Sequence, residues 1–152
     1  MNSSTEIDAE SGVLHTPPEP HFSREQLEQA LDKSPFAQLI GFNLTHYSAG
    51  SIEMEVVPRQ ELTQHHGFVH GAVIGFMIDS ACAWAAASMV GDVVTSEYKV
   101  NMLAPALGEK LICRSDVIKA GKRQVVTRAD VFAVRDGIQK MVATGLATIA
   151  RI

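Results

Sequence analysis

The sequence has few cysteines and no excess of positive charge. It contains 152 residues, two of which are cysteines, and its formal net charge is −4. A nucleic-acid-binding face needs a surplus of lysine and arginine, so the overall charge argues against that class of protein. Cys82 and Cys113 have neither metal-ligand spacing nor the look of a disulfide framework. This favours two reduced, buried thiols in a cytoplasmic protein.

The first 21 residues lack the features of a secretion signal. They mix serine, glutamate and proline, without the basic start and apolar stretch that a signal peptide has. We therefore expect residues 1–21 to form a flexible tail. Residues 22–152 are long enough to bury a single hydrophobic core, so we expect them to form one domain.

The chain has one long hydrophobic run, from Gly71 to Val90. Its length reaches the roughly 18 residues that indicate a membrane span when nearly all are apolar. The run also contains Asp79, two serines and six alanines, and an acidic residue at mid-membrane is costly. Amphipathic strands are predicted after this run, and their apolar faces need the hydrophobic core of a globular domain to pack against. A buried core helix therefore explains the run better than a transmembrane segment.

Capping and turn signals divide the rest of the chain into short elements. Ser23 followed by Gln26 is a capping-box pattern that begins a helix ending near Leu31. Pro35 begins a second short helix that ends at Gly41. Alternating polarity predicts strands between these turn signals. The predicted strands are 42–47, 51–57, a segment around 97–102, 110–119, 124–134 and 138–152.

These elements predict an α+β fold built around the long helix. A helix that is apolar on most of its circumference has to be covered on most sides, and an antiparallel sheet is the available cover. We therefore expect five to six antiparallel strands wrapped around one long central helix. Such a sheet keeps two open edges, and an open edge invites pairing with a second subunit.

Asp79 and Gly71 are the residues of the long helix that suggest chemistry. A carboxylate on an apolar helix costs free energy unless it is paired or used. Gly71 falls at the predicted helix start, where backbone N–H groups lack intrahelical partners, the dipole favours negative charge, and no Cβ obstructs a carbonyl. Such an N–H can form an oxyanion hole for acyl transfer. The two residues lie roughly 12 Å apart along the helix, so two antiparallel copies in a two-fold dimer would bring them together better than one.

The segment HGAVIGFMIDSACAWAA resembles the hotdog-fold acyl-CoA thioesterases, in particular the phenylacetate-degradation (PaaI-like) branch. That family has His-Gly-Gly, six residues and then an acidic residue, with Asn or Gln seven residues before the oxyanion glycine. His70, Gly71, Asp79 and Gln64 keep this spacing, while Ala72 replaces the second glycine. The following YKVNMLAPALGEKL is similar to the family's next strand and turn, and the resemblance covers residues 35–150.

The resemblance implies hydrolysis of acyl-CoA thioesters. The Gly71 N–H would polarise the thioester carbonyl, and Asp79 of the other subunit would act as general base or nucleophile. Gln64 would hold the water or the thioester. Thr95 aligns approximately with a family serine that contacts the attacking water, and Ser96 is a second candidate for that role.

The resemblance also implies where coenzyme A lies. Its phosphates would contact the hairpin that holds Gly121, Lys122 and Arg123, and His70 would stand at the helix entry beside the substrate. Coenzyme A is part of the substrate, so no separate cofactor is expected. The expected partner is another copy of the chain, in a homotetramer arranged as a dimer of dimers, without nucleic acid or membrane.

Simpler interpretations of the same residues stay open. Asp79 could hydrogen-bond a neighbouring backbone group, and Lys122–Arg123 could be a plain exposed turn. His65, His66 and His70 suggest a metal, but no acidic third ligand has suitable spacing. Two other functions also use or keep this kind of pocket, namely enoyl-CoA hydration and non-catalytic acyl-CoA sensing.

Overall fold

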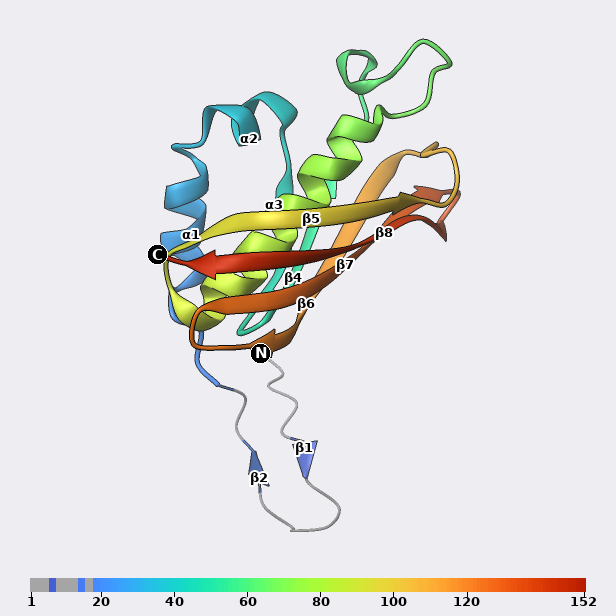
Figure 1. Ribbon diagram of the computed structural model, residues 1–152. Helices are drawn as coiled ribbons and strands as arrows, with labels where there is room; N and C mark the ends of the chain where they lie inside the picture. The colour runs from blue at the N-terminus through green and yellow to red at the C-terminus, as the bar shows by residue number, and fades with distance from the viewer. Residues whose placement is uncertain (1–5, 8–13, 16–17) are drawn as a thin grey trace.

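A 20-residue helix, α3 (Gly71–Val90), runs through the fold, and a six-stranded sheet curves around it (Figure 1). The computed structural model describes residues 6–7, 14–15 and 18–152. The strands of the large sheet are β3 (Asn43–Ser48), β4 (Ser51–Val56), β5 (Val93–Met102), β6 (Lys110–Ala120), β7 (Gln124–Arg135) and β8 (Ile138–Arg151). The predicted hotdog architecture is therefore confirmed, with strand bounds within a few residues of the sequence pattern.

The N-terminal part of the chain contributes one small additional sheet. The strands β1 (Glu6–Ile7) and β2 (Leu14–His15) pair antiparallel, and the sequence pattern did not predict them. The expectation of a flexible tail over residues 1–21 falls largely on residues 1–5, 8–13 and 16–17, which lie outside the described residues.

The two ends of α3 follow from local signals in the sequence. His70 is the N-cap, and its Nδ1 accepts a hydrogen bond from the Ala72 N–H at 3.0 Å. Gly91 ends the helix with φ of 90°, a backbone conformation that glycine adopts without steric cost. Between these ends, Met77, Ile78 and the other sheet-facing side chains are fully buried.

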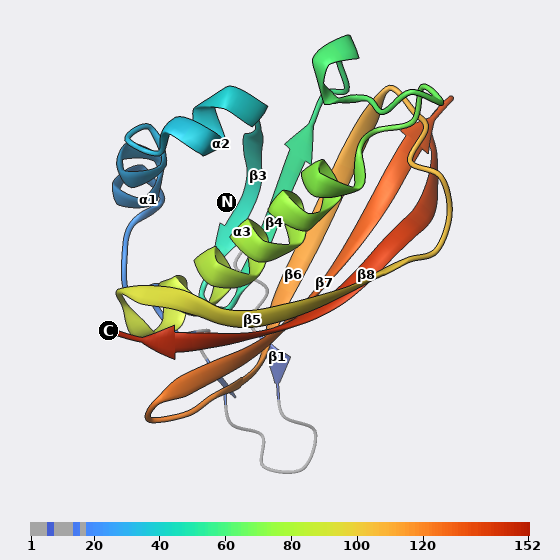
Figure 2. The same cartoon turned by 45° about the horizontal axis from the view of Figure 1, so that its top comes forward.

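The burial of α3 answers the question of a membrane span. The helix is long and apolar enough to cross a membrane, but 56% of its most apolar stretch is buried inside the protein. The curved sheet supplies this cover, as Figure 2 shows from a second direction. The helix is thus the core helix of the fold, as the sequence predicts.

The sheet order places β5 beside the C-terminal strand. The order is β3-β4-β6-β7-β8-β5, and every neighbouring pair is antiparallel. The strand that directly follows α3 is therefore an edge strand, and β3 forms the other edge. Gly145 of β8 lets β5 and α3 approach closely, because a Cβ there would lie 2.8 Å from both an Ile78 methyl group and the Lys99 carbonyl oxygen.

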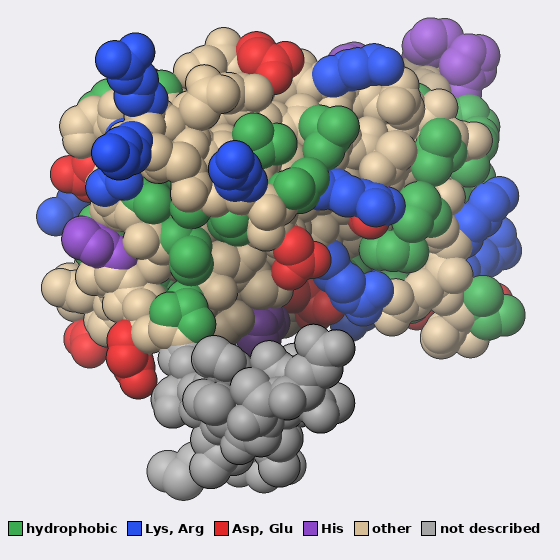
Figure 3. Space-filling model, turned by 60° about the horizontal axis from the view of Figure 1, so that its bottom comes forward, with side chains coloured by type: hydrophobic (Ala, Val, Ile, Leu, Met, Phe, Trp, Pro, Cys, Tyr) green, Lys and Arg blue, Asp and Glu red, His purple; other side chains and the backbone are tan. Residues whose placement is uncertain are grey.

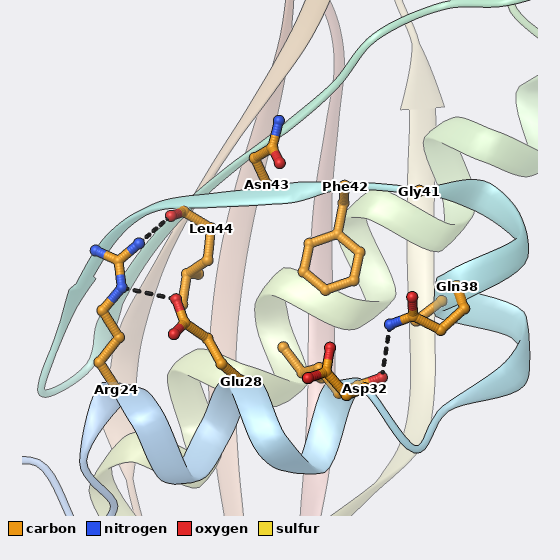
Figure 4. Close-up of a pocket in the computed structure, with 10 residues that line it drawn as sticks. Arg24, Glu28, Asp32, Gln38, Gly41, Phe42, Asn43 and Leu44 are labelled. Atoms are coloured by element: carbon orange, nitrogen blue, oxygen red, sulfur yellow. Dashed lines mark hydrogen bonds and ion pairs between the residues drawn. The ribbon is translucent and has the colours of Figure 1, made fainter.

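The β3 edge is partly covered by the chain itself. The helices α1 (Arg24–Leu31) and α2 (Pro35–Ile40) lie beside β3, and the predicted capping box of Ser23 and Gln26 begins α1. Figure 4 shows the Arg24 guanidinium donating to the Leu44 carbonyl of β3 and, at 2.9 Å, to the Glu28 carboxylate. An arginine that occupies an edge carbonyl makes pairing with a further strand less favourable there.

Charged groups are distributed over the surface in view. In Figure 3, lysine and arginine side chains are spread across the face shown, with hydrophobic side chains between them. The outer face of the sheet carries exposed Ile118 and Leu146 together with Lys99 and Arg128, around a hollow of about 410 Å³. On the face shown in Figure 3, positive and negative side chains are therefore interspersed.

Candidate active site

The first turn of α3 presents one free backbone donor. The Ala72 N–H is already used by the His70 cap, and the Val73 N–H donates to the His70 carbonyl at 2.9 Å. Among the described residues, the Gly71 N–H makes no hydrogen bond. It stands at the positive end of the helix dipole, so it is suited to receive an oxyanion. The same contacts assign His70 to capping this helix.

Gln64 lies beside this donor. A hollow of about 340 Å³ lies at the start of α3, and its lining includes Gln64, Phe68, Gly71, Ile74 and Met102. Gln64 belongs to the loop before α3, which backbone hydrogen bonds hold in place, including one from the Gln64 N–H to the Phe68 carbonyl at 2.8 Å. The Gln64 side chain accepts a further hydrogen bond from the His66 N–H. The structure therefore brings together two residues that the sequence predicts to share a site.

Asp79 lies two turns further along α3. Eight residues separate it from Gly71, which at the helical rise corresponds to roughly 12 Å. Its Oδ1 atom is buried, and within the described part of the chain it has no hydrogen-bond partner. The simpler interpretation, in which Asp79 serves a neighbouring backbone group, thus finds no support for this oxygen.

The cysteine nearest to Asp79 on the helix is held in its neutral form. Burial raises the pKa of the Cys82 thiol, hydrogen bonds from Thr127 and Ser115 partly oppose this, and the negative charge of Asp79 raises it further. The Ser115 hydroxyl lies 3.6 Å from the Cys82 sulfur. Cys82 therefore belongs to the core rather than to a nucleophilic site.

Thr95 and Ser96 lie far from the helix start in the same chain. Thr95 pairs with Ile149 near the beginning of β5, and the strand register shifts between Thr95 and Glu97, next to the exposed Ser96. Met102, at the other end of β5, contacts the Gly71 position. Seven residues of strand separate Thr95 from Met102, which is roughly 23 Å. Within one chain, Thr95 cannot reach a thioester at Gly71.

The hairpin of Gly121, Lys122 and Arg123 also lies at the far end. It joins β6 to β7, and the Arg123 carbonyl accepts from the Arg151 N–H of β8 at 3.1 Å. Lys122 and Arg123 are exposed. In Figure 1 this hairpin lies near the C-terminus, whereas the start of α3 lies at the opposite end. One chain thus separates the predicted residues into two groups, with Asp79 between them.

The structure adds residues that sequence reasoning did not single out. The side chains of Tyr98 and Met102, on β5, pack against two glycines of α3. The Tyr98 hydroxyl oxygen is 3.3 Å from where a Cβ on Gly75 would lie, and the Met102 methyl group is 3.3 Å from the Cβ position of Gly71. The signals available were the alternation of β5 and the spacing of two glycines one turn apart.

Metal binding finds no support in this arrangement. Among residues 6–7, 14–15 and 18–152, no three His, Cys, Asp or Glu side chains are grouped so that they could hold a metal ion. His65 and His66 instead stack on each other, with ring centroids 4.0 Å apart.

Comparison with known proteins identifies the class. The model of the Thioesterase superfamily matches residues 66–139. A thioesterase family protein from Silicibacter pomeroyi is 33% identical, with a TM-score of 0.80, over 83% of this chain and 95% of that one. The chain belongs to the thioesterase superfamily, with the hotdog fold.

Two further structures place the chain within that class. The phenylacetic acid degradation protein PaaI from Thermus thermophilus, in a mutant form, is 26% identical over 78% of this chain and all of that one, with a TM-score of 0.69. The E. coli PaaI protein shares the fold at 21% identity and a TM-score of 0.76, over 84% of this chain and 91% of that one. The protein is a PaaI-like hotdog thioesterase.

Proposed function

We propose that the protein hydrolyses acyl-CoA thioesters to a free acid and coenzyme A, at a site shared between two subunits. The observation that carries the proposal is the division of the candidate residues. Gln64 and the free Gly71 N–H lie at the start of α3, Thr95 and the basic hairpin lie at the opposite end of the chain, and Asp79 lies between them on α3. Only a second copy in the reverse orientation brings both ends to one substrate.

The edge strand β5 is the surface through which such a dimer would form. Its inward-facing Tyr98 and Met102 are 44% and 53% exposed, because no described strand of the same chain lies beyond β5. Antiparallel pairing of β5 with a second β5 about a two-fold axis would extend the sheet and bury these side chains. It would also carry the Met102 end of one chain, with Gly71, toward the Thr95 end of the other.

The chemistry of the shared site then follows. The Gly71 N–H of the partner subunit donates a hydrogen bond to the thioester carbonyl oxygen, and Asp79 takes a proton from a water that attacks the carbonyl carbon. The tetrahedral intermediate collapses by breaking the C–S bond. The departing thiolate of coenzyme A takes the proton back from Asp79, so the carboxylate is regenerated. Thr95 or Ser96 holds the water, and Gln64 of the partner subunit holds the thioester. An alternative in which Asp79 attacks directly uses the same residues.

The basic hairpin would bind the phosphates of coenzyme A. Lys122 and Arg123 are exposed at the β5 end that approaches the helix start of the second chain. Charge-assisted hydrogen bonds from these side chains suit phosphate oxygens. A dimer of dimers, in the cytoplasm where acyl-CoA is available, completes the proposal.

A panel of acyl-CoAs tests the proposed activity. The purified protein is incubated with aromatic, medium-chain and hydroxylated acyl-CoAs, and released coenzyme A is followed with a thiol reagent. We expect release from at least one class, and release slower by about 10²–10⁴ from the Asp79→Asn variant. Binding of acyl-CoA without release would indicate a sensor instead, and water addition to an enoyl-CoA would indicate a hydratase.

A further inference from the structure

The two tyrosines of the chain have different surroundings. The sequence contains only Tyr47 and Tyr98. The Tyr47 hydroxyl donates to the Phe22 carbonyl at 2.6 Å, which ties β3 to the segment before α1. The Tyr98 hydroxyl makes no hydrogen bond to any described residue, although its ring is packed against α3. Tyr98 is 44% exposed in a single chain, so its hydroxyl is free to donate to a group on α3.

Helix geometry places the Asp79 carboxylate near the Tyr98 hydroxyl. Side chains on a helix lean toward its N-terminus, so the Asp79 carboxylate covers the turn that contains Gly75. The Tyr98 hydroxyl oxygen lies over the same turn, 3.3 Å from the Cβ position of Gly75. The buried Oδ1 of Asp79 also lacks a partner among the described residues. Two unpaired groups, a donor and an acceptor, thus converge over one glycine.

The neighbouring thiol does not fill this role. Cys82 is the titratable group on α3 next to Asp79, but its sulfur contacts the Ser115 hydroxyl in the core. Burial raises the pKa of the Cys82 thiol, so it stays protonated near neutral pH. A thiol is also a weak donor compared with a phenol hydroxyl. Tyr98 is therefore the better partner for the carboxylate.

We propose that Tyr98 is the positioning residue for Asp79, donating its hydroxyl to the carboxylate directly or through one water. The inference rests on the proposed function, in which Asp79 is the base. A charge-assisted hydrogen bond favours the ionised carboxylate and fixes one oxygen, so the other is aimed at the attacking water. Because Tyr98 belongs to the edge strand, pairing of β5 with a second subunit would also exclude solvent from this bond.

Gly75 is the residue that makes room for this arrangement. A methyl group at position 75 would lie 3.3 Å from the Tyr98 hydroxyl oxygen and 3.9 Å from its ring. The ring would have to move by a few tenths of an ångström, although alanine is the better helix former. Gly75→Ala therefore displaces the hydroxyl without deleting it and without weakening the helix.

The decisive test compares Tyr98→Phe with Tyr47→Phe, which make the same chemical change at two sites. In Tyr98→Phe we expect kcat to fall about tenfold at neutral pH with KM unchanged, as the loss of one hydrogen bond to a charged group predicts. The acidic limb of the kcat/KM profile, which reports protonation of the base in the free enzyme, should move to higher pH. Tyr47→Phe should lower the melting temperature and leave the limb in place.

Gly75→Ala and Asp79→Asn separate the possible outcomes. Gly75→Ala should move the acidic limb of the kcat/KM profile to higher pH by less than Tyr98→Phe does. Its melting temperature should not fall. If Asp79→Asn loses activity while the limb stays in place in both Tyr98→Phe and Gly75→Ala, the positioning role of Tyr98 is wrong and the proposed function stands. If Asp79→Asn keeps full activity, the proposed base is wrong and the inference falls with it.

Discussion

The unpaired oxygen of Asp79 is the least expected feature of the core helix. Leaving a buried polar atom without a hydrogen bond costs about 1–3 kcal/mol, more when it is charged. Oδ1 of Asp79 is such an atom within the described residues, whereas the neighbouring positions on α3 are apolar or small. A fold tolerates this cost where the group has a use, and the shared site proposed above would supply one.

Removing the charge at Asp79 should therefore remove activity and keep the fold. In Asp79→Asn we expect kcat to fall by about 10²–10⁴, the usual contribution of general-base catalysis. Acyl-CoA binding and the melting temperature should stay close to those of the parent, because the amide has the same shape. Asp116→Asn, at an exposed position on β6, provides the matched control. Parental rates in the Asp79 variant would make this carboxylate structural.

The two cysteines should not react with thiol reagents in the native protein. Burial raises the pKa of Cys82, and burial with the nearby charges raises that of Cys113 well above its usual value. At neutral pH both thiols are then protonated and inaccessible, so reaction is slow. We expect no rapid reaction in buffer and reaction of both after denaturation. Fast modification of the native protein would contradict their burial and would also disturb the coenzyme A assay.

Single residues were predictable where the signal is local. Asp79 stands out because it interrupts an apolar run, and Gly71 because it lies at the predicted start of the long helix. Tyr98 could not be assigned in this way, since the residue it rests on, Gly75, belongs to a different element. That contact depends on how β5 crosses α3, which periodicity alone does not give.

The start of α3 allows the backbone donor to be removed on its own. Proline is favoured at the first position of a helix, and the preceding His70 already has the extended conformation that proline requires, with ψ of 140°. Gly71→Pro should therefore fold normally while lacking the N–H. We expect kcat to fall by about 10²–10³, as for loss of an oxyanion donor.

Gly71→Ala is the comparison that isolates the N–H. It keeps the donor and adds a methyl group that would lie 3.3 Å from the flexible end of Met102. Its loss of kcat should be clearly smaller than that of Gly71→Pro. Equal losses in the two variants would mean that space at the helix start, and not the N–H, limits the reaction.

The hairpin between β6 and β7 should contribute binding rather than chemistry. Replacing Lys122 and Arg123 together by alanine should raise KM for acyl-CoA about tenfold, because phosphate contacts are lost. The kcat value, and the rates with small thioesters that lack coenzyme A, should not change. Replacing Arg135 and Lys140 at the opposite hairpin removes the same charge and is the control. A rise in KM for both kinds of substrate would exclude a phosphate contact.

The arrangement of the elements was only partly predictable. The capping box at Ser23 and the signals at Pro35 and Gly41 predicted the bounds of the short helices, the apolar run predicted those of α3, and alternation predicted the strands, because these signals act within a few residues. The position of β5 beside β8 was not predictable. It depends on contacts between segments distant in sequence, such as the close approach of Gly145 to Ile78.

The large sheet has one edge that is partly covered and one that is open. Arg24 of α1 occupies a carbonyl of β3, whereas β5 pairs only with β8 within the described chain. Val94, Tyr98 and Met102 are each exposed by more than two fifths along this open strand. We therefore expect at least a dimer at micromolar concentration, and light scattering that shows a monomer would count against the shared site.

Mixing two inactive variants tests the shared site directly. If each site takes Gly71 from one subunit and Asp79 from the other, homodimers of Gly71→Pro and of Asp79→Asn each lack one component at both sites. A mixed dimer has one site with both defects and one intact site. After subunit exchange at equal amounts, half of the dimers should be mixed, and activity should return to about a quarter of the parental level.

Each variant taken through the same exchange alone should stay inactive. If the mixture also stays inactive although labelled subunits have exchanged, both residues act within one chain, and the roughly 12 Å along α3 would have to be spanned by the substrate itself.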